Sequence, residues 1–186
     1  RGGTAAEDVH SFNNSRFRYF YTSELSTING GDGDDILVTG YNTTSVGGAG
    51  NDTFIIRDPA VQGVTSHNNF IKGVSNTQET IILTYSGETA PTQDDVTFER
   101  EELRELPGSG SRAERFVVRL LVNGVKYADF ASGASQPQVY GNDVSIAGFR
   151  EMLADGRITF MRDDAVDALH VAETARQVMM DQESQV

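Results

Sequence analysis

Apolar residues occur along this chain in short runs, and several of these runs have the length of β-strands. Among the longest are residues 116–118 and 120–122, which flank Arg119. The pair Asn123-Gly124 follows directly, and a second β-prone run covers residues 125–130. Asn-Gly supplies the two positive-φ positions of a type I′ turn, so this segment predicts a β-hairpin. An aromatic cluster at 17–21 predicts a further strand, and residues 68–130 as a whole have the texture of β structure.

The last part of the chain has a helical period instead. Residues 144–153 lie between Asp143, a predicted N-cap, and Gly156, a predicted stop signal. From Asp163 onward, apolar residues recur every three or four positions, which is typical of one face of an amphipathic helix. We expect this stripe to be buried against the β part or against another chain; it consists of Val166, Leu169, Ala172, Ala175 and Met179.

Charge and composition exclude several classes of function. The chain has 186 residues, with 27 acidic and 15 basic side chains and a formal net charge of −12. Nucleic-acid binding needs a basic face, and a membrane-spanning helix needs roughly 20 apolar residues, so neither is expected. There is no cysteine and there are only three histidines. No catalytic motif is present, and we expect a protein that is not an enzyme.

Two glycine-aspartate repeats carry the most informative chemistry. Residues 30–38 read Gly-Gly-Asp-Gly-Asp-Asp-Ile-Leu-Val, and residues 47–55 read Gly-Gly-Ala-Gly-Asn-Asp-Thr-Phe-Ile. Both match the nonapeptide G-G-x-G-x-D-x-U-x, in which U is a large apolar residue and whose loops bind calcium. Glycines allow a tight loop that turns carbonyls toward one point, and carbonyl and carboxylate oxygens are the ligands that Ca²⁺ prefers. The predicted calcium ligands and loop residues are Gly30, Gly31, Asp32, Gly33, Asp35, Gly47, Gly48, Ala49, Gly50 and Asp52.

The spacing of the repeats limits the number of ions. The second repeat starts 17 residues after the first, close to the spacing of about 18 at which such loops stack. We therefore expect one calcium site between loops 30–35 and 47–52, with Asp32 contributing its carbonyl rather than its side chain. A second site could use oxygens near 65–70, from Asn68 or Asn69. The alternative is a pair of glycine-rich loops that hold no ion.

This region resembles the repeats-in-toxin (RTX) family, whose hemolysin-type calcium-binding repeats occur in proteins exported by bacterial type I secretion. The resemblance is closest to the C-terminal domain of serralysin-type proteases, and it covers residues 30–83. Downstream of the repeats, Glu79-Thr-Ile81-Ile-Leu83 lies where the family has D-x-I-x-L, so Glu79 replaces an aspartate. The protease motif H-E-x-x-H is absent.

The resemblance implies a short parallel β-roll, and the strand and helix patterns add an antiparallel β layer that continues from it and one or two C-terminal helices, so we expect a mostly β fold. Three parts are expected: an N-terminal strand and flank at 1–29, the calcium-binding β-roll and its capping strands at 30–83, and a hairpin with a helical cap at 84–186. The implied function is calcium-dependent folding, secretion and stability of an exported protein that is secreted or held at the cell surface.

Two other functions remain open. The chain could be a self-associating or adhesive module of a surface layer or matrix, in which the C-terminal helix contacts neighbouring chains. It could also be the non-catalytic, calcium-binding part of an extracellular hydrolase or polysaccharide-modifying enzyme. In that case a surface polysaccharide would be retained by exposed aromatic residues such as Tyr127 or Tyr140.

Overall fold

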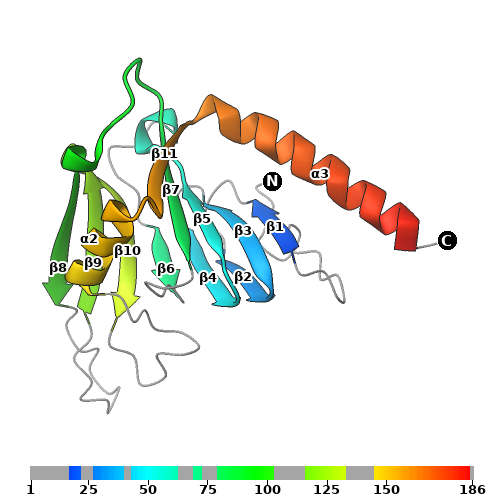
Figure 1. The fold of residues 1–186 in the computed structure, drawn as a ribbon, viewed down its shortest axis with the longest axis horizontal. Coiled ribbons are helices and arrows are strands. Elements are labelled where there is room, and N and C mark those ends of the chain that lie inside the picture. The colour runs from blue at the N-terminus through cyan, green and yellow to red at the C-terminus, as the bar shows by residue number, and fades with distance from the viewer. Residues whose placement is uncertain are drawn as a thin grey trace, which may run out of the picture.

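Two β-sheets form the body of the protein (Figure 1). The computed structural model describes residues 17–21, 27–39, 43–62, 69–72, 79–102, 116–132 and 145–184. One sheet is five-stranded and entirely parallel, in the order β1-β3-β5-β7-β11. Its strands are β1 (Phe17–Tyr21), β3 (Asp34–Thr39), β5 (Thr53–Ile56), β7 (Thr80–Tyr85) and β11 (Ile158–Arg162).

The second sheet is six-stranded and mixed, in the order β2-β4-β6-β10-β9-β8. The first four strands of this order pair in parallel, and the last three pair antiparallel. The strands are β2 (Thr27–Asp32), β4 (Thr44–Ala49), β6 (Phe70–Lys72), β8 (Val96–Glu102), β9 (Phe116–Val122) and β10 (Val125–Ser132). Successive strands from β1 to β7 alternate between the two sheets.

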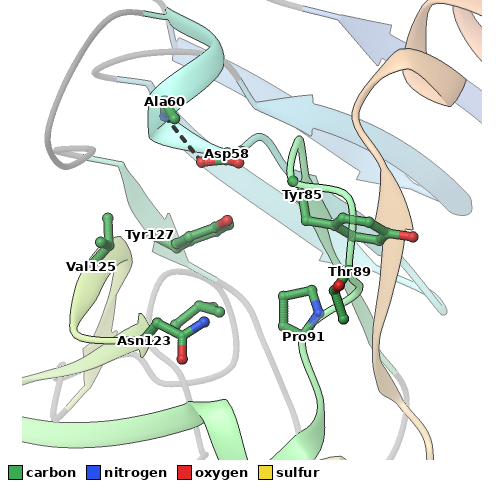
Figure 2. Close-up of a pocket in the computed structure, with 10 residues that line it drawn as sticks. Asp58, Ala60, Tyr85, Thr89, Pro91, Asn123, Val125 and Tyr127 are labelled. Carbon is green, nitrogen blue, oxygen red and sulfur yellow. Dashed lines mark hydrogen bonds between the residues drawn. The ribbon is translucent and has the colours of Figure 1, made fainter.

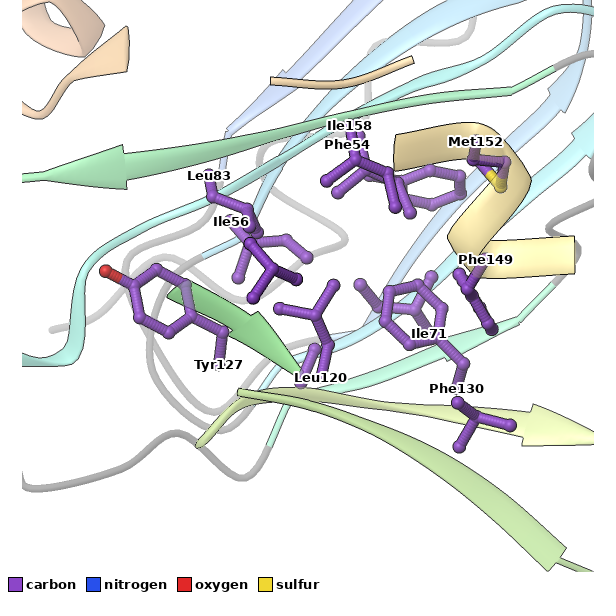
Figure 3. Packing of buried hydrophobic residues seen from close by; sticks show 14 of the residues in the cluster. Phe54, Ile56, Ile71, Leu83, Leu120, Tyr127, Phe130, Phe149, Met152 and Ile158 are labelled. Atoms are coloured by element: carbon purple, nitrogen blue, oxygen red, sulfur yellow. The ribbon is translucent and has the colours of Figure 1, made fainter. Parts of the chain in front are cut away.

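The two sheets enclose the main hydrophobic core (Figure 3). Strand alternation points every second side chain inward, for example Leu37 from β3 and Phe54 from β5. Helix α2 (Ile146–Ala154) closes the core between β8 and β11, and the ring of its Phe149 packs on Phe98 and Phe130 at centroid distances of 5.3 and 4.8 Å. This aromatic trio joins the helix to the antiparallel strands.

Helix α3 (Asp164–Ser184) packs on the other face of the parallel sheet with its first turns. Val166 is fully buried there against Val38 and Ile55, and Leu169 is half-buried. The rest of the predicted stripe, Ala172, Ala175 and Met179, is exposed, and the helix runs on past β1 (Figure 1). Burial of this stripe by the chain itself is therefore limited to its beginning.

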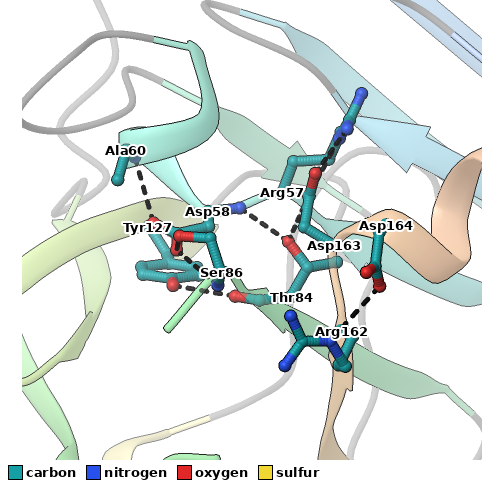
Figure 4. Close-up of polar contacts among 9 residues, drawn as sticks. All are labelled: Arg57, Asp58, Ala60, Thr84, Ser86, Tyr127, Arg162, Asp163 and Asp164. Carbon is teal, nitrogen blue, oxygen red and sulfur yellow. Dashed lines mark hydrogen bonds and ion pairs between the residues drawn. The ribbon is translucent and has the colours of Figure 1, made fainter. Parts of the chain in front are cut away.

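A buried ion pair ties the parallel sheet to the start of α3 (Figure 4). Arg57, directly after β5, donates from Nε to Oδ1 of Asp163 at 3.0 Å and from Nη2 to Oδ2 at 2.5 Å. The Thr84 hydroxyl donates to the same Oδ1 at 2.7 Å. Arg57 and Asp163 are only 9% and 5% exposed. Burying charged groups is costly unless they are paired and hydrogen-bonded, and these contacts meet both conditions.

The local predictions from sequence are confirmed in part. The β9–β10 hairpin turns at Asn123 and Gly124, with φ values of 50° and 79°. The aromatic cluster at 17–21 forms β1, and both predicted helices exist. Asp143 lies outside the described residues, and the N-cap of α2 is Ser145, whose side chain accepts a hydrogen bond from the Gly148 backbone N–H.

The predicted fold class is wrong. The sequence suggested a mostly β chain, in which a short β-roll at 30–56 runs into a separate antiparallel layer. In its described part the structure is instead an α/β arrangement of two flat sheets, one all parallel and one mixed, with two helices and no β-roll. Parallel pairing does not stop at β5, because β7 and β11 extend the same sheet, and β11 arrives only after the α2 connection. The antiparallel strands are an extension of the second sheet and not a layer of their own.

Candidate metal centre

The two glycine-aspartate turns lie side by side, as their spacing predicts. Turn 30–35 leads from β2 into β3, and turn 47–52 leads from β4 into β5. Gly31 pairs with Gly48 in the parallel register, and Asp32 pairs with Ala49. The backbone N–H of Gly33 donates to the carbonyl of Ala49 at 2.8 Å. The turns therefore form one continuous surface at the end of the parallel sheet where its strands begin.

Glycine is required at the close approach between these turns. Gly48 and Gly50 have φ values of 99° and 131°, which side chains rarely tolerate. A Cβ on Gly48 would lie 2.0 Å from the carbonyl oxygen of Gly31, and a Cβ on Gly50 would lie 2.1 Å from that of Gly33. The glycines of the repeat thus let one turn stack directly on the next.

Two buried carboxylates stand at the ends of the turns. Asp35 and Asp52 are each only 1% exposed. The backbone N–H of Asp35 donates to Oδ1 of Asp52 at 3.0 Å, whereas Oδ2 of Asp52 is buried and has no hydrogen-bond partner among the described residues. Leaving a buried polar atom unsatisfied costs about 1–3 kcal/mol, and more for a charged group. Oδ2 of Asp52 can therefore still accept a hydrogen bond or coordinate a cation.

Oxygen atoms converge on the space in front of Gly30 and Gly47. A Cβ built on Gly30 would lie 2.4 Å from the carbonyl oxygen of Gly47 and 2.6 Å from Oδ2 of Asp35. A Cβ built on Gly47 would lie 2.4 Å from Oδ2 of Asp52. Each carboxylate thus occupies room that a side chain would otherwise take. Carbonyl and carboxylate oxygens together form the donor set of a hard cation such as Ca²⁺.

Negative charge accumulates along this end of the parallel sheet. The pKa of Asp52 is raised to about 7. Burial is the largest cause, the charges of Asp35, Glu79 and Asp34 also raise it, and the hydrogen bond from the Asp35 backbone lowers it. Glu79 immediately precedes β7, and the backbone N–H of Thr80 donates to the carbonyl of Asp52 at 2.9 Å. A cation here would offset mutual repulsion among these carboxylates as well as their burial.

Glu79 is not among the site residues predicted from the sequence. The structure buries it to 2% exposure beside Asp52. Thr53 and Thr80 pair directly between β5 and β7, and local sequence patterns do not reveal this pairing. Placing these strands in register puts the acids before them next to each other.

The two outer acids of the first repeat face solvent. Asp32 and Asp34 are both exposed, in agreement with a role for Asp32 through its carbonyl alone. Oδ1 of Asp34 accepts a hydrogen bond from the Asn51 backbone N–H at 2.8 Å, which ties the two turns together from outside.

Asn69 does not contribute to a second site beside these turns. It precedes β6 and lies next to Thr43, at the opposite end of β4 from turn 47–52. Its Oδ1 accepts from the Thr43 backbone N–H at 3.0 Å, and its Nδ2 donates to the Tyr127 carbonyl at 3.5 Å. The prediction for Asn69 is wrong because its carboxamide links neighbouring strands. Asn68 lies outside the described residues.

Tyr127 is not an exposed platform for a polysaccharide. It is 4% exposed, and its hydroxyl donates to the Thr84 carbonyl at 2.8 Å. Tyr140, the other aromatic residue considered, lies outside the described residues.

Side-chain ligands alone do not make a metal site. In the part of the chain that the structure describes, no group of three or more His, Asp or Glu side chains could hold a metal ion. A cation at the turns would therefore depend on backbone carbonyls together with Asp35 and Asp52. No described helix has the length and apolar character of a bilayer-spanning segment. Comparison with protein-family models, curated proteins and solved structures gives no match.

Proposed function

We propose that this chain is a calcium-binding module of an exported bacterial protein, and that its folding is linked to the cation. The observation that carries the proposal is Oδ2 of Asp52, a buried carboxylate oxygen without a hydrogen-bond partner, beside a second buried carboxylate in stacked turns. Water cannot neutralise this charge where it lies. A divalent cation supplies the missing positive charge and accepts the carbonyl oxygens that the glycines expose.

Named residues would hold the ion. Asp35 and Asp52 would supply carboxylate oxygens, and residues 30–33 and 47–50 would supply carbonyl oxygens. Glu79 would add negative charge on the β7 side of Asp52. The bound cation supplies electrostatic neutralisation and cross-linking of the two turns. The chain itself supplies the stacking, through its glycines and the hydrogen bond from Asp35 to Asp52.

Ligand-linked folding follows from this arrangement. An ion that binds only the folded state stabilises it by RT ln(1 + [Ca]/Kd), about 1.4 kcal/mol at a tenfold excess over Kd. Sites in extracellular modules have Kd values of about 10⁻⁴–10⁻³ M, so they stay empty at cytosolic calcium and fill outside the cell. The repeats and the acidic chain, with net charge −12, support a module that gains stability after export.

A second candidate is a self-associating surface or matrix module. The observation that favours it is the exposed outer part of α3, where Val171, Val178, Met179 and Met180 are 68%, 50%, 62% and 41% exposed. Size-exclusion chromatography with and without calcium separates the candidates, because self-association predicts an oligomer that is lost when α3 is truncated after Leu169.

Thermal unfolding of the full chain tests the main proposal. We expect calcium at ten times its Kd to raise Tm by about 3–6 °C relative to a chelator, given a size near 186 residues. The Asp35→Ala plus Asp52→Ala double variant should lose this shift, and the Asp94→Asn variant, altered at an exposed acid on a distant 3-10 helix, should keep it. An equal shift in the double variant and the native chain would refute the site.

A further inference from the structure

A pocket lies at the opposite end of the parallel sheet from the glycine-aspartate turns (Figure 2). It has a volume of about 460 Å³. Asp58 follows β5, Tyr85 ends β7, and the β9–β10 turn with Asn123 and Val125 closes the other side. Carboxyl ends of parallel strands are common places for ligands, because loops from several strands meet there.

The carboxylate of Asp58 is held in a fixed orientation (Figure 4). Its Oδ1 accepts from the Ala60 backbone N–H at 3.0 Å, and its Oδ2 accepts from Ser86 N and Oγ at 3.1 and 2.8 Å. Its own backbone N–H donates to the Thr84 hydroxyl at 2.7 Å. All of these partners are neutral. The carboxylate is therefore preorganised, and none of these hydrogen-bond donors is a counter-charge.

The basic residues near Asp58 are committed to other acids. Arg57 pairs with Asp163, and Arg162 pairs with Asp164 at 3.4 Å and donates to the Gly87 carbonyl at 3.3 Å. Within the described ranges, no salt bridge reaches Asp58. Beyond burial, the charges of Asp58 and Asp163 raise the pKa of the Tyr127 hydroxyl. The pocket therefore carries a negative potential.

The rest of the lining is mostly apolar and aromatic. Tyr127, Val122, Val125 and Pro91 form much of the wall, and Tyr85 contributes its ring. The guanidinium of Arg162 already lies 5.7 Å from the Tyr85 ring centroid. Tyr127 is only 4% exposed, so little of its ring is open to a ligand, whereas Val125 is 37% exposed. Aromatic faces attract cations, and aliphatic walls favour alkyl groups.

We propose that this pocket binds a small organic cation, with its ammonium group at Asp58 and its alkyl part against Val125 and Pro91. A metal ion fits poorly, because Asp58 is the pocket's single carboxylate and hard cations need six to eight oxygens. An anion is disfavoured by the charge of Asp58. A sugar would need several more fixed polar groups than Asn123 and Thr89 provide.

Titration of the full chain with n-butylammonium, followed by ¹⁵N NMR in saturating calcium, tests this proposal. We expect saturable shifts at Ser86, Asn123 and Tyr127, with a Kd in the millimolar range. The neutral isostere 1-butanol should bind at least tenfold more weakly. The reporter residues lie at the opposite end of the parallel sheet from Asp35 and Asp52, so their shifts report on the pocket whether or not calcium binds at the turns.

Variants complete the design. Asp58→Asn should weaken binding at least tenfold, and Asp94→Asn, a matched exposed-acid control, should leave it unchanged. Val125→Trp should block the pocket without altering the hydrogen bonds of Asp58, and so serves if Asp58→Asn fails to fold. The proposal is overturned if no saturable shift occurs, if 1-butanol or glucose binds equally well, or if Val125→Trp and a folded Asp58→Asn leave binding intact.

Discussion

The backbone N–H of Asp35 donates a hydrogen bond of 3.0 Å to one oxygen of Asp52, while the other oxygen of that carboxylate is buried without a partner. The hydrogen bond fixes the Asp52 side chain against the neighbouring turn. It does not neutralise the charge, because burial and the acids Asp35, Glu79 and Asp34 still raise the pKa of Asp52 to about 7. Backbone hydrogen bonds thus hold the turns in place, while the buried negative charges at the turns lower the stability of the folded state.

Asp52→Asn should change stability in opposite directions with and without calcium. In chelator at pH 8, removing the charge relieves burial and repulsion, and we expect the free energy of unfolding to rise by roughly 1–3 kcal/mol. In calcium the variant should be less stable than the native chain, because a charged ligand is lost. The asparagine oxygen can still accept from Asp35. Chemical denaturation in both buffers measures the effect, and a loss of stability in chelator would contradict the assignment.

Stability without calcium should fall as pH rises from about 4 to 7. The pKa of Asp52 is raised from 3.8 to about 7 on folding, so in this window the folded state binds more protons than the unfolded state. The contribution is fully present below 3.8 and is lost as pH passes 7, with a slope of at most about 1.4 kcal/mol per pH unit. The difference between the native chain and Asp52→Asn, measured in chelator across this range, isolates the effect. A difference that does not depend on pH would be inconsistent with it.

Gly48→Ala should destabilise the protein far more than Gly124→Ala. Both glycines have positive φ, at 99° and 79°, which costs an alanine roughly 1–2 kcal/mol. Only at Gly48 would the new Cβ also meet a backbone oxygen, at 2.0 Å from Gly31, whereas nothing lies within 4 Å at Gly124. We expect Gly48→Ala to exceed the Gly124→Ala cost by at least about 1 kcal/mol and to weaken calcium binding. Similar costs for the two variants would show that the turns do not need their close approach.

Asp163→Asn should destabilise the protein by about 3–5 kcal/mol, because it removes the carboxylate charge that pairs with the buried guanidinium of Arg57. Asp164→Asn is the matched control, since Asp164 is exposed and its pair with Arg162 is at the surface. That variant should cost less than about 1 kcal/mol. Urea unfolding measures both, and equal small effects would indicate that the Arg57 pair adds little to stability.

Much of the local structure could be predicted from short-range signals. Asn123-Gly124 forms the turn of the β9–β10 hairpin because the pair tolerates positive φ at both positions. The spacing of the repeats predicted that turns 30–35 and 47–52 lie together, and they do. The hairpin turn depends on backbone geometry within a few residues. The position of the two glycine-aspartate turns depends on the spacing between the repeats, which can be counted in the sequence.

The partners of each strand could not be read from the same signals. Local patterns do not reveal that β11 joins β7 after the α2 connection, or that β10 joins β6. Glu79 became a neighbour of Asp52, and Asn69 was carried to the far end of β4, only through these pairings. Tyr127 was predicted to be exposed. For the same reason it is instead buried, with its hydroxyl bonded to the Thr84 carbonyl.

The sequence by itself determined the turns, the hairpin, the helices and the acids of the candidate site, because φ preferences, side-chain period and ligand chemistry belong to the residues themselves. Only the tertiary structure decided the α/β class, the burial of Asp52 and Glu79 together, and the pocket at Asp58. Those features arise where segments far apart in the chain share hydrogen bonds and exclude water. The free energy of these contacts depends on the whole arrangement of strands.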